Sequence, residues 1–321
     1  ALKFAFGTEG MPKWGNDVSV ATVAADNVNF KFPLLHGDSV EMTGTVVNAG
    51  KSSIAVHVET NRLMFPSRQK QLVSESYFFM VVIQKAGEDG IKTKDGLVPP
   101  LMIADDKHWH LHRTSVSARE GQKLLAEESK KLKSGDALVP AKLAEVTLAA
   151  KRDHHVTFES TKTSANRLFF PGHLNLNKTI FGGEIIRWME MHAVHCGRLF
   201  TKNKNVFTIG MHSCEFRHPI LLSDWVSLEA HAVYVHNTTL EIDVEVFIER
   251  PDHPIISNKA SFVVTNFDEV GMRKEIPVGL DLESASQEWL HRYASAKHRY
   301  SVSRHRCMLD PKLALSKVSK Q

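Results

Sequence analysis

Apolar and polar residues alternate in short runs along two stretches of the chain, residues 18–59 and 206–247. A period of two predicts β-strands with one buried side and one solvent-facing side. Turn-forming residues interrupt the first stretch at 36–38 and the second at 223–224, so consecutive strands should pair as antiparallel hairpins. Each stretch is followed by a further β-prone run, residues 77–83 in the first half and 260–267 in the second.

The two stretches follow one plan. FKFP at residues 30–33 aligns with FRHP at 216–219, and the same offset of 186 residues holds without a gap along both stretches. The sequence therefore predicts two β domains in tandem.

A helix is predicted before the second sheet, where apolar residues recur at helical spacing. Its apolar face comprises Ile185, Trp188, Met189, His192, Ala193, Cys196 and Leu199. We expect the second sheet to wrap around this helix. The same offset places the first copy's helix mostly before residue 1, and residues 4–16 contain three glycines and a proline. We therefore expect that the first copy has lost most of its helix, or that the sequence begins after it.

The segment between the copies, residues 97–158, is not a low-complexity linker. A polar helix is predicted from Ser117 to Ser134, and Pro140 is expected to begin a second, short helix up to about Lys151. We expect this connector to pack across the outside of the two sheets.

Composition is that of a globular protein. The 321 residues are 42% hydrophobic, which suffices for two cores. The longest apolar runs fall far short of the ~20 residues that span a bilayer, so no membrane span is expected. Three cysteines without metal-type spacing favour a reducing compartment over a disulfide framework.

Positive charge is concentrated at the carboxyl end. Residues 291–321 contain eight Lys or Arg and one acidic residue, whereas the whole chain has a formal charge of only +4. Such a tail can contact RNA or an acidic protein surface, or it can be a solvated basic end, and the sequence leaves both alternatives open.

Candidate chemistry lies in 175-NLNKTIFGGEIIRWMEMHAVHC-196. Glu190 stands inside the apolar helix, where a carboxylate is costly unless it is paired or used. Gly182 and Gly183 begin the helix, where the missing side chains expose backbone N–H groups to a developing oxyanion. Asn175 lies in the polar loop before them and can orient water or a carbonyl group.

The order of Asn175, the glycine turn, Glu190 and FRHP at 216–219 resembles the acyl-CoA thioesterases of the hotdog fold. The repeat and the helical connector make the chain similar to the mitochondrial double-hotdog members over most of residues 18–290. The resemblance implies an α+β tandem hotdog, with antiparallel sheets wrapped around a central helix. Its expected parts are a first hotdog at 1–96 with its helix missing or truncated, a helical connector at 97–158, a second hotdog at 159–285 and a basic tail at 286–321.

The resemblance also implies a reaction, the hydrolysis of a fatty acyl-CoA to free acid and CoA in the mitochondrial matrix. Glu190 would activate water as the base, Asn175 would orient the water or the carbonyl, and Gly182 and Gly183 would stabilise the oxyanion. No metal or other cofactor is expected, and coenzyme A enters only as part of substrate and product. The cations nearest in sequence for its phosphates are Lys178, Arg198, Lys202 and Lys204.

The chain departs from the family pattern in one respect. In these thioesterases the working site takes its asparagine from one hotdog and its acid from the other, whereas here only the second copy shows either residue. Glu9 is a poor substitute because it lies in glycine-broken sequence. The alternative function is therefore a catalytically silent subunit with a structural role in a large mitochondrial complex such as a ribosome. A third hypothesis is a sensor that binds acyl-CoA without hydrolysing it. We expect a homo-oligomer or a subunit of a larger assembly.

Simpler explanations exist for the same residues. The two glycines can serve only the packing of the helix start, and Glu190 can pair with Arg187 or Arg198 on the helix surface. Asp224 has a counterpart in Asp38, which favours a turn-forming role over catalysis.

Histidines suggest two further sites that we do not favour. His192, His195 and Cys196 have helical spacing, but such residues on an apolar helix usually belong to the core or its rim rather than to a metal site. The alternating histidines of 107-KHWHLHR-113 predict an extended connector surface, and they comprise His108, His110 and His112.

Overall fold

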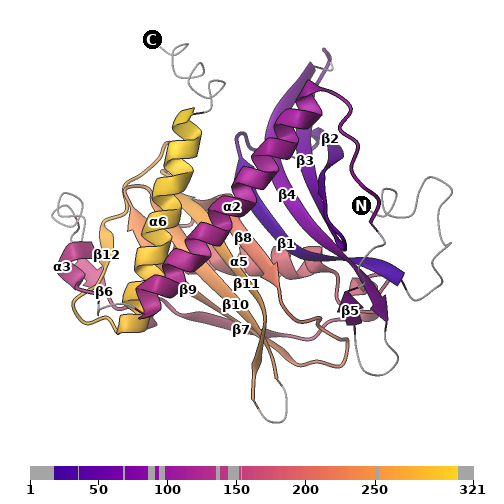
Figure 1. Cartoon of the computed structure of the whole chain (residues 1–321). Helices are drawn as coiled ribbons and strands as arrows, with labels where there is room; N and C mark the ends of the chain where they lie inside the picture. Colours follow the sequence, from indigo (N-terminus) through magenta and orange to yellow (C-terminus); the bar gives the residue numbers. More distant parts are fainter. Residues whose placement is uncertain are drawn as a thin grey trace.

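One antiparallel sheet of ten strands runs through both halves of the chain in the computed structural model (Figure 1). The structure describes residues 18–34, 36–67, 69–85, 91–93, 98–134, 138–143, 152, 154–249 and 253–309. The strand order is β2-β3-β4-β1-β8-β11-β10-β9-β7, with β5 paired to β4. A separate parallel pair joins β12 to β6.

The first half of the sheet comprises β1 (Val18–Phe30), β2 (Ser39–Ala49), β3 (Ser53–Met64), β4 (Gln69–Lys85) and β5 (Ile91–Thr93). The second half comprises β7 (Thr163–Arg167), β8 (Val206–Phe216), β9 (Val226–His236), β10 (Thr239–Ile248) and β11 (Ile255–Asn266). The small pair is β6 (His154–Val156) and β12 (Val278–Leu280). The helices are α2 (Asp106–Ser134), α3 (Pro140–Leu143), α5 (Gly182–Thr201) and α6 (Gln287–Leu309), with short 3₁₀ turns η2 (Glu159–Thr161) and η3 (Pro171–His173).

The repeat is visible as a pseudo-twofold relation between the copies. Strands β1 to β4 correspond to β8 to β11, and the copies join where β1 pairs antiparallel with β8, from Ala24 opposite Glu215 to Asn29 opposite Gly210. A Cβ at Gly210 would lie 2.8 Å from the carbonyl oxygen of Val28, so only glycine allows this close approach. The predicted α+β tandem hotdog is confirmed. The expected loss of the first helix falls on residues 1–17, outside the described residues.

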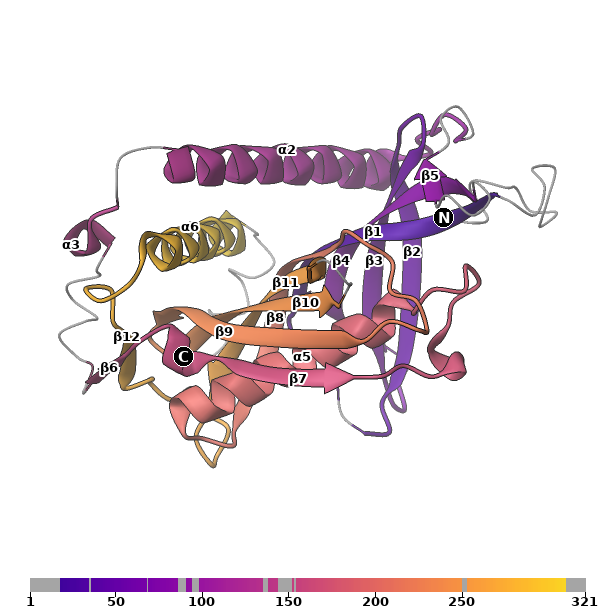
Figure 2. The same ribbon diagram turned by 90° about the horizontal axis from the view of Figure 1, so that it is seen from below.

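Helix α5 fills the concave side of the second half (Figure 2). Its apolar face packs on β8 to β11, and the buried members are Ile185, Trp188, Met189, Ala193, Cys196, Gly197 and Phe200. The chain leaves the helix through Lys202, whose φ of 51° is left-handed. The prediction that Leu199 belongs to the buried face is wrong, because this side chain is 57% exposed on the outer side of α5.

The opposite, convex face carries α2 and α6 (Figure 2). The predicted packing of the connector across the outside of the sheets is therefore confirmed for α2, which contacts β2, β3 and α6. Pro140 begins α3 as predicted, but the described part of that helix ends at Leu143 and residues 144–151 lie outside the described residues. None of the described helices is long and apolar enough to cross a membrane.

Helix α2 begins eleven residues earlier than predicted, and the extended conformation expected for its histidines is wrong. The Asp105 carboxylate accepts a bond from the backbone N–H of His108 and so caps the first turn. One turn later His112 lies on the same face as His108. The His108 ring bonds the carbonyl oxygen of Val46 at 2.8 Å, and the His112 ring bonds that of Val47 at 2.7 Å. Both carbonyls lie at a bulge in β2.

Part of the predicted basic tail is a packed helix. In α6, Leu290, Tyr293 and Ala296 are buried against the second half of the sheet. Arg292 forms an ion pair with Glu245, whereas Arg299 pairs with Glu241 and Asp243. These two arginines form ion pairs within the chain, so they differ from both alternatives left open for the basic end, contact with a polyanion and full solvation. Residues 310–321 lie outside the described residues.

Candidate active site

The loop that leads into α5 is organised by Asn175. Its Oδ1 accepts bonds from the backbone N–H groups of Asn177 and Thr179, at 2.8 and 3.2 Å, and its Nδ2 donates to Thr179 Oγ1 at 2.9 Å. The backbone N–H of Asn175 also bonds the carbonyl of Thr179, and the turn passes through Lys178 with a φ of 59°. Asn175 therefore serves the turn, while the second N–H of its amide has no bond among those of the described residues.

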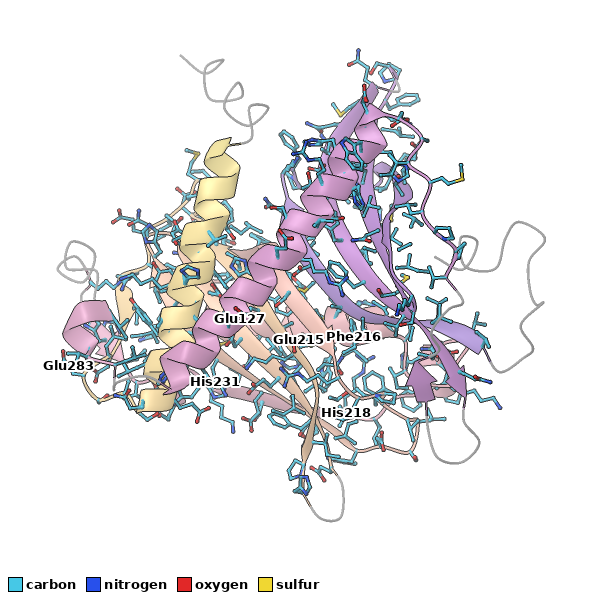
Figure 3. The ribbon with its side chains drawn as sticks, viewed as in Figure 1. Glu127, Glu215, Phe216, His218, His231 and Glu283 are labelled. Carbon is cyan, nitrogen blue, oxygen red and sulfur yellow. The ribbon has the colours of Figure 1, made fainter. Side chains whose placement is uncertain are left out.

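The two glycines at the start of α5 lie close to aromatic side chains. A Cβ at Gly182 would lie 2.8 Å from the ring of Phe216, which stands at the end of β8 (Figure 3). A Cβ at Gly183 would lie 2.5 Å from the ring of Phe181, the residue that precedes the helix. These contacts support the packing explanation, most clearly at Gly182. It does not conflict with an oxyanion role, because their N–H groups belong to the first helical turn and have no partner four residues earlier.

Glu190 is half-buried on α5 and accepts a hydrogen bond from a residue of the sheet. Thr208 of β8 donates a hydrogen bond from Oγ1 to Glu190 Oε1 at 2.5 Å. The alternative of an ion pair with Arg187 or Arg198 is not found among the ion pairs of the described residues. Arg187 instead has its Nη1 at 4.0 Å from Glu184 Oε1. Glu190 is therefore held by a neutral donor.

Thr208 is a site residue that the sequence interpretation missed. A threonine in a β-strand is unremarkable by itself, since branched residues favour strands. Thr22 occupies the same position in the first copy, so the internal repeat does not distinguish Thr208 either. Its importance becomes visible only once the docking of α5 brings it to Glu190.

The length of α5 separates the candidate groups. Glu190 lies eight residues after Gly182, which is about 12 Å along the helix axis. The N–H groups at the start of α5 and the Glu190 carboxylate are therefore too far apart to contact the same substrate group. Among the predicted phosphate ligands, Lys178 lies before α5, whereas Arg198 is in its last turn. Lys202 and Lys204 follow that last turn, so the structure does not bring the four cations together.

The helical histidines and cysteine behave as core and rim residues. Cys196 is buried and donates its thiol to the carbonyl of Thr161 at 3.4 Å, and burial raises its pKa to about 12. Burial lowers the pKa of His192, with a smaller contribution from His195 beside it. Asp224 bonds the backbone N–H of Leu221 at 2.8 Å, which agrees with its predicted turn-forming role.

Sequence comparison finds similarity to one family in both halves of the chain. Residues 5–62 and 177–254 match the model of the Thioesterase superfamily. An uncharacterized acyl-CoA thioester hydrolase of Buchnera aphidicola subsp. Baizongia pistaciae is 28% identical over 114 residues, which cover 34% of this chain and 84% of that protein. Protein VdlD of Helicobacter pylori is 27% identical over 93 residues, which cover 29% of this chain and 53% of that protein.

Similar solved structures include an acyl-CoA hydrolase from Staphylococcus aureus in complex with butyryl coenzyme A and coenzyme A. It is 20% identical with a TM-score of 0.45, and the match covers 52% of this chain and 99% of that one. A hexameric acyl-CoA thioesterase is 23% identical with a TM-score of 0.44, and the match covers 49% and 99%. Segments in both halves of the chain thus match the Thioesterase superfamily model, and an acyl-CoA thioester hydrolase is among the similar proteins.

Proposed function

We propose that the protein hydrolyses acyl-CoA thioesters, with Glu190 as the base that activates water. The observation that carries the proposal is the bond from Thr208 Oγ1 to Glu190 Oε1, which fixes a half-buried carboxylate on the face of a thioesterase-type helix. The superfamily match and the acyl-CoA thioester hydrolase relative support the same reaction.

In the proposed reaction, the second carboxylate oxygen of Glu190 takes a proton from water while the water oxygen attacks the thioester carbonyl carbon. The tetrahedral oxyanion is stabilised by backbone N–H groups at a helix start. The intermediate then collapses with cleavage of the C–S bond. The CoA sulfur leaves as a thiolate and is protonated, and the acyl group departs as a free acid.

This reaction requires a second polypeptide segment. The glycine N–H groups and Glu190 of α5 are about 12 Å apart along the helix, too far to act on one carbonyl group. We therefore infer two half-sites, one at the start of α5 and one at Glu190. Each half-site needs a complementary helix and loop, supplied by residues outside the described ones or by another chain.

The same geometry favours a second candidate function, a silent structural subunit. In the described part of the first copy there is no helix equivalent to α5, and therefore no acid to complete the half-site at Asn175. A role within a larger assembly, contact of the remaining basic residues with RNA or an acidic protein, and residence in the mitochondrial matrix all stay predictions.

Thiol release from acyl-CoA separates the two functions. Short-, medium- and long-chain acyl-CoAs are offered to the full chain and to its Glu190→Gln variant. Glu184→Gln is the matched control, since Glu184 lies on the same helix and pairs with Arg167 at 3.8 Å. The proposal predicts turnover by the wild-type protein and the control but not by Glu190→Gln. A folded wild-type protein that releases no thiol at saturating substrate would overturn the hydrolase proposal for this chain.

A further inference from the structure

The chain leaves β11 through a tight turn, residues 268–272, that presents apolar side chains to solvent. The Asp268 carboxylate accepts hydrogen bonds from the backbone N–H groups of Val270 and Met272, at 3.0 and 2.8 Å. The backbone N–H of Asp268 in turn bonds the carbonyl of Met272 at 2.8 Å. Val270 is 83% exposed and Met272 is 66% exposed. The turn therefore holds two large apolar side chains outward on a hydrogen-bonded backbone.

The corresponding connection of the first copy lacks large apolar residues. In the second copy Phe267 pairs with Arg273 across the turn, and in the first copy Lys85 pairs with Ile91, so five residues separate the paired positions in each. These five residues read DEVGM in the second copy and AGEDG in the first. A connection of this length and pairing therefore does not require a valine and a methionine.

The turn adjoins the segment that links α5 to β8. Asn203 Nδ2 donates to the carbonyl of Phe267 at 2.7 Å, and Asn205 Nδ2 donates to the carbonyl of Asp268 at 3.2 Å. At the start of β8, Phe207 is 53% exposed, and its ring centroid lies 6.0 Å from that of Phe267. Exposed apolar side chains of two chain segments thus gather at one end of the second half, which is typical of an interaction surface.

Basic side chains accompany these apolar residues. Four exposed cations lie next to the turn in the two adjoining segments, namely Lys202, Lys204, Arg273 and Lys274. None of the four forms an ion pair with another residue of the described ranges. The exposed acids of the turn and its exit are only Glu269 and Glu275, because the Asp268 carboxylate is engaged by the turn itself. We call the set the β11 turn surface, and it comprises Lys202, Lys204, Phe207, Val270, Met272, Arg273 and Lys274.

We propose that the β11 turn surface docks on an anionic phospholipid bilayer. Val270 and Met272 insert among the lipid headgroups, where their exposed apolar area leaves water. The four cations stay at the rim and contact anionic headgroups. A bilayer suits this arrangement better than RNA does, because contact with phosphates alone would leave both apolar side chains in water. Binding of this kind requires no membrane-spanning helix and does not depend on the proposed hydrolase activity.

Vesicle co-sedimentation tests the apolar part of the surface. The full chain is mixed at about 0.1 M salt with vesicles of phosphatidylcholine alone or with about 30% phosphatidylserine. We expect affinity for the anionic vesicles to fall at least about tenfold in the double variant Val270→Ser, Met272→Ser, because it removes the inserted side chains. The matched control is Met102→Ser, which removes a side chain that is 86% exposed elsewhere and should bind like the wild-type chain.

A second pair of variants tests the charge. Lys202→Gln with Lys204→Gln should weaken binding to the anionic vesicles at least about tenfold, since each basic residue near an anionic surface contributes to affinity. Lys51→Gln with Lys107→Gln removes two exposed lysines of the first half and should leave binding unchanged. The basic carboxyl end can bind anionic lipid by itself, but every variant retains it, so differences between variants report on the β11 turn surface.

An environment-sensitive fluorophore locates the inserted residues. It is attached to Val270→Cys or, as the control, to Met102→Cys, each combined with Cys307→Ser, while the native Cys196 and Cys214 are buried. We expect anionic vesicles to shift the emission of the label at position 270 to shorter wavelength and to leave that at position 102 unchanged. Equal shifts at the two positions overturn the proposal.

Three results of the binding experiments would also overturn it. The first is a folded wild-type chain that does not bind the anionic vesicles. The second is the loss of binding in the lysine variant alone, because the surface then binds polyanions such as RNA by charge and not a bilayer by insertion. The third is a changed oligomeric state of the Val270→Ser, Met272→Ser variant in sedimentation velocity without lipid, because the occupant is then a second copy of this chain.

Discussion

Replacing Arg299 by alanine should destabilise the protein strongly, because this side chain neutralises two buried carboxylates. Its Nε donates to Glu241 Oε1 at 2.6 Å, and its guanidinium lies 3.3 Å from Asp243 Oδ1. The side chains of Glu241 and Asp243 are only 3% and 4% exposed. Breaking a buried ion pair from one side costs about 3–5 kcal/mol, since the remaining charge is left without compensation.

The matched control is Arg217→Ala. Arg217 pairs with Glu215 at 2.7 Å, but the two side chains are 45% and 50% exposed, so the loss should be within about 1 kcal/mol. Urea unfolding followed by circular dichroism gives both values at pH 7. Equal losses for the two variants would refute the account of α6 docking. An Arg299→Met variant that stays destabilised, and recovers when both buried acids become amides, would assign the effect to charge.

Three further predictions concern the site, the junction of the copies and the response to acid. Thr208→Val should lower kcat of thioester hydrolysis about tenfold or more, because it removes the hydroxyl that orients the base, whereas Thr208→Ser keeps the hydroxyl and should retain activity. Equal rates of thiol release for the two variants would exclude this role. Gly210→Ala should lower the free energy of unfolding in urea by about 1–3 kcal/mol, because the added Cβ meets the Val28 carbonyl. The control Gly172→Ala should be nearly neutral, because nothing lies within 4 Å of its added Cβ. The reverse order would contradict the described β1–β8 pairing. Burial opposes ionisation of Asp243, but the charges of its arginine and lysine neighbours hold its pKa below the usual value of 3.8. This contribution to stability is therefore complete above about pH 4 and is lost as the pH falls through the folded-state pKa, which an acid titration of the unfolding midpoint should show.

The sheet was predictable from sequence because each copy repeats the same alternation at a constant offset. Because the two copies align at an offset of 186 residues, each strand predicted in one copy can be checked against its counterpart in the other. Helix α5 was predictable for a similar reason, because its apolar face is continuous over most of its length. Leu199 was misplaced because helical spacing alone does not show where the sheet stops covering the helix.

The remaining errors arise where local pattern and tertiary contact disagree. The start of α2 was missed because the histidines of residues 107–113 alternate as they would in a strand. His108 and His112 lie on one face of the helix because they bond carbonyl oxygens at the bulge of β2, a contact that the local sequence does not show. The packing of α6 was not predicted, because its arginines find their partners on β10, far away in sequence. Thr208 has no local signature at all, since its role depends on the docking of α5.

The central claim is that Glu190 is the base for thioester hydrolysis, and a single-turnover measurement tests it most directly. Enzyme in excess over one acyl-CoA isolates the chemical step from product release, and the wild-type protein is compared with Glu190→Gln and Glu184→Gln. The account predicts that the chemical step slows about 10²–10⁴-fold in Glu190→Gln and stays near the wild-type rate in Glu184→Gln. A measurable wild-type rate that is unchanged in Glu190→Gln would contradict it.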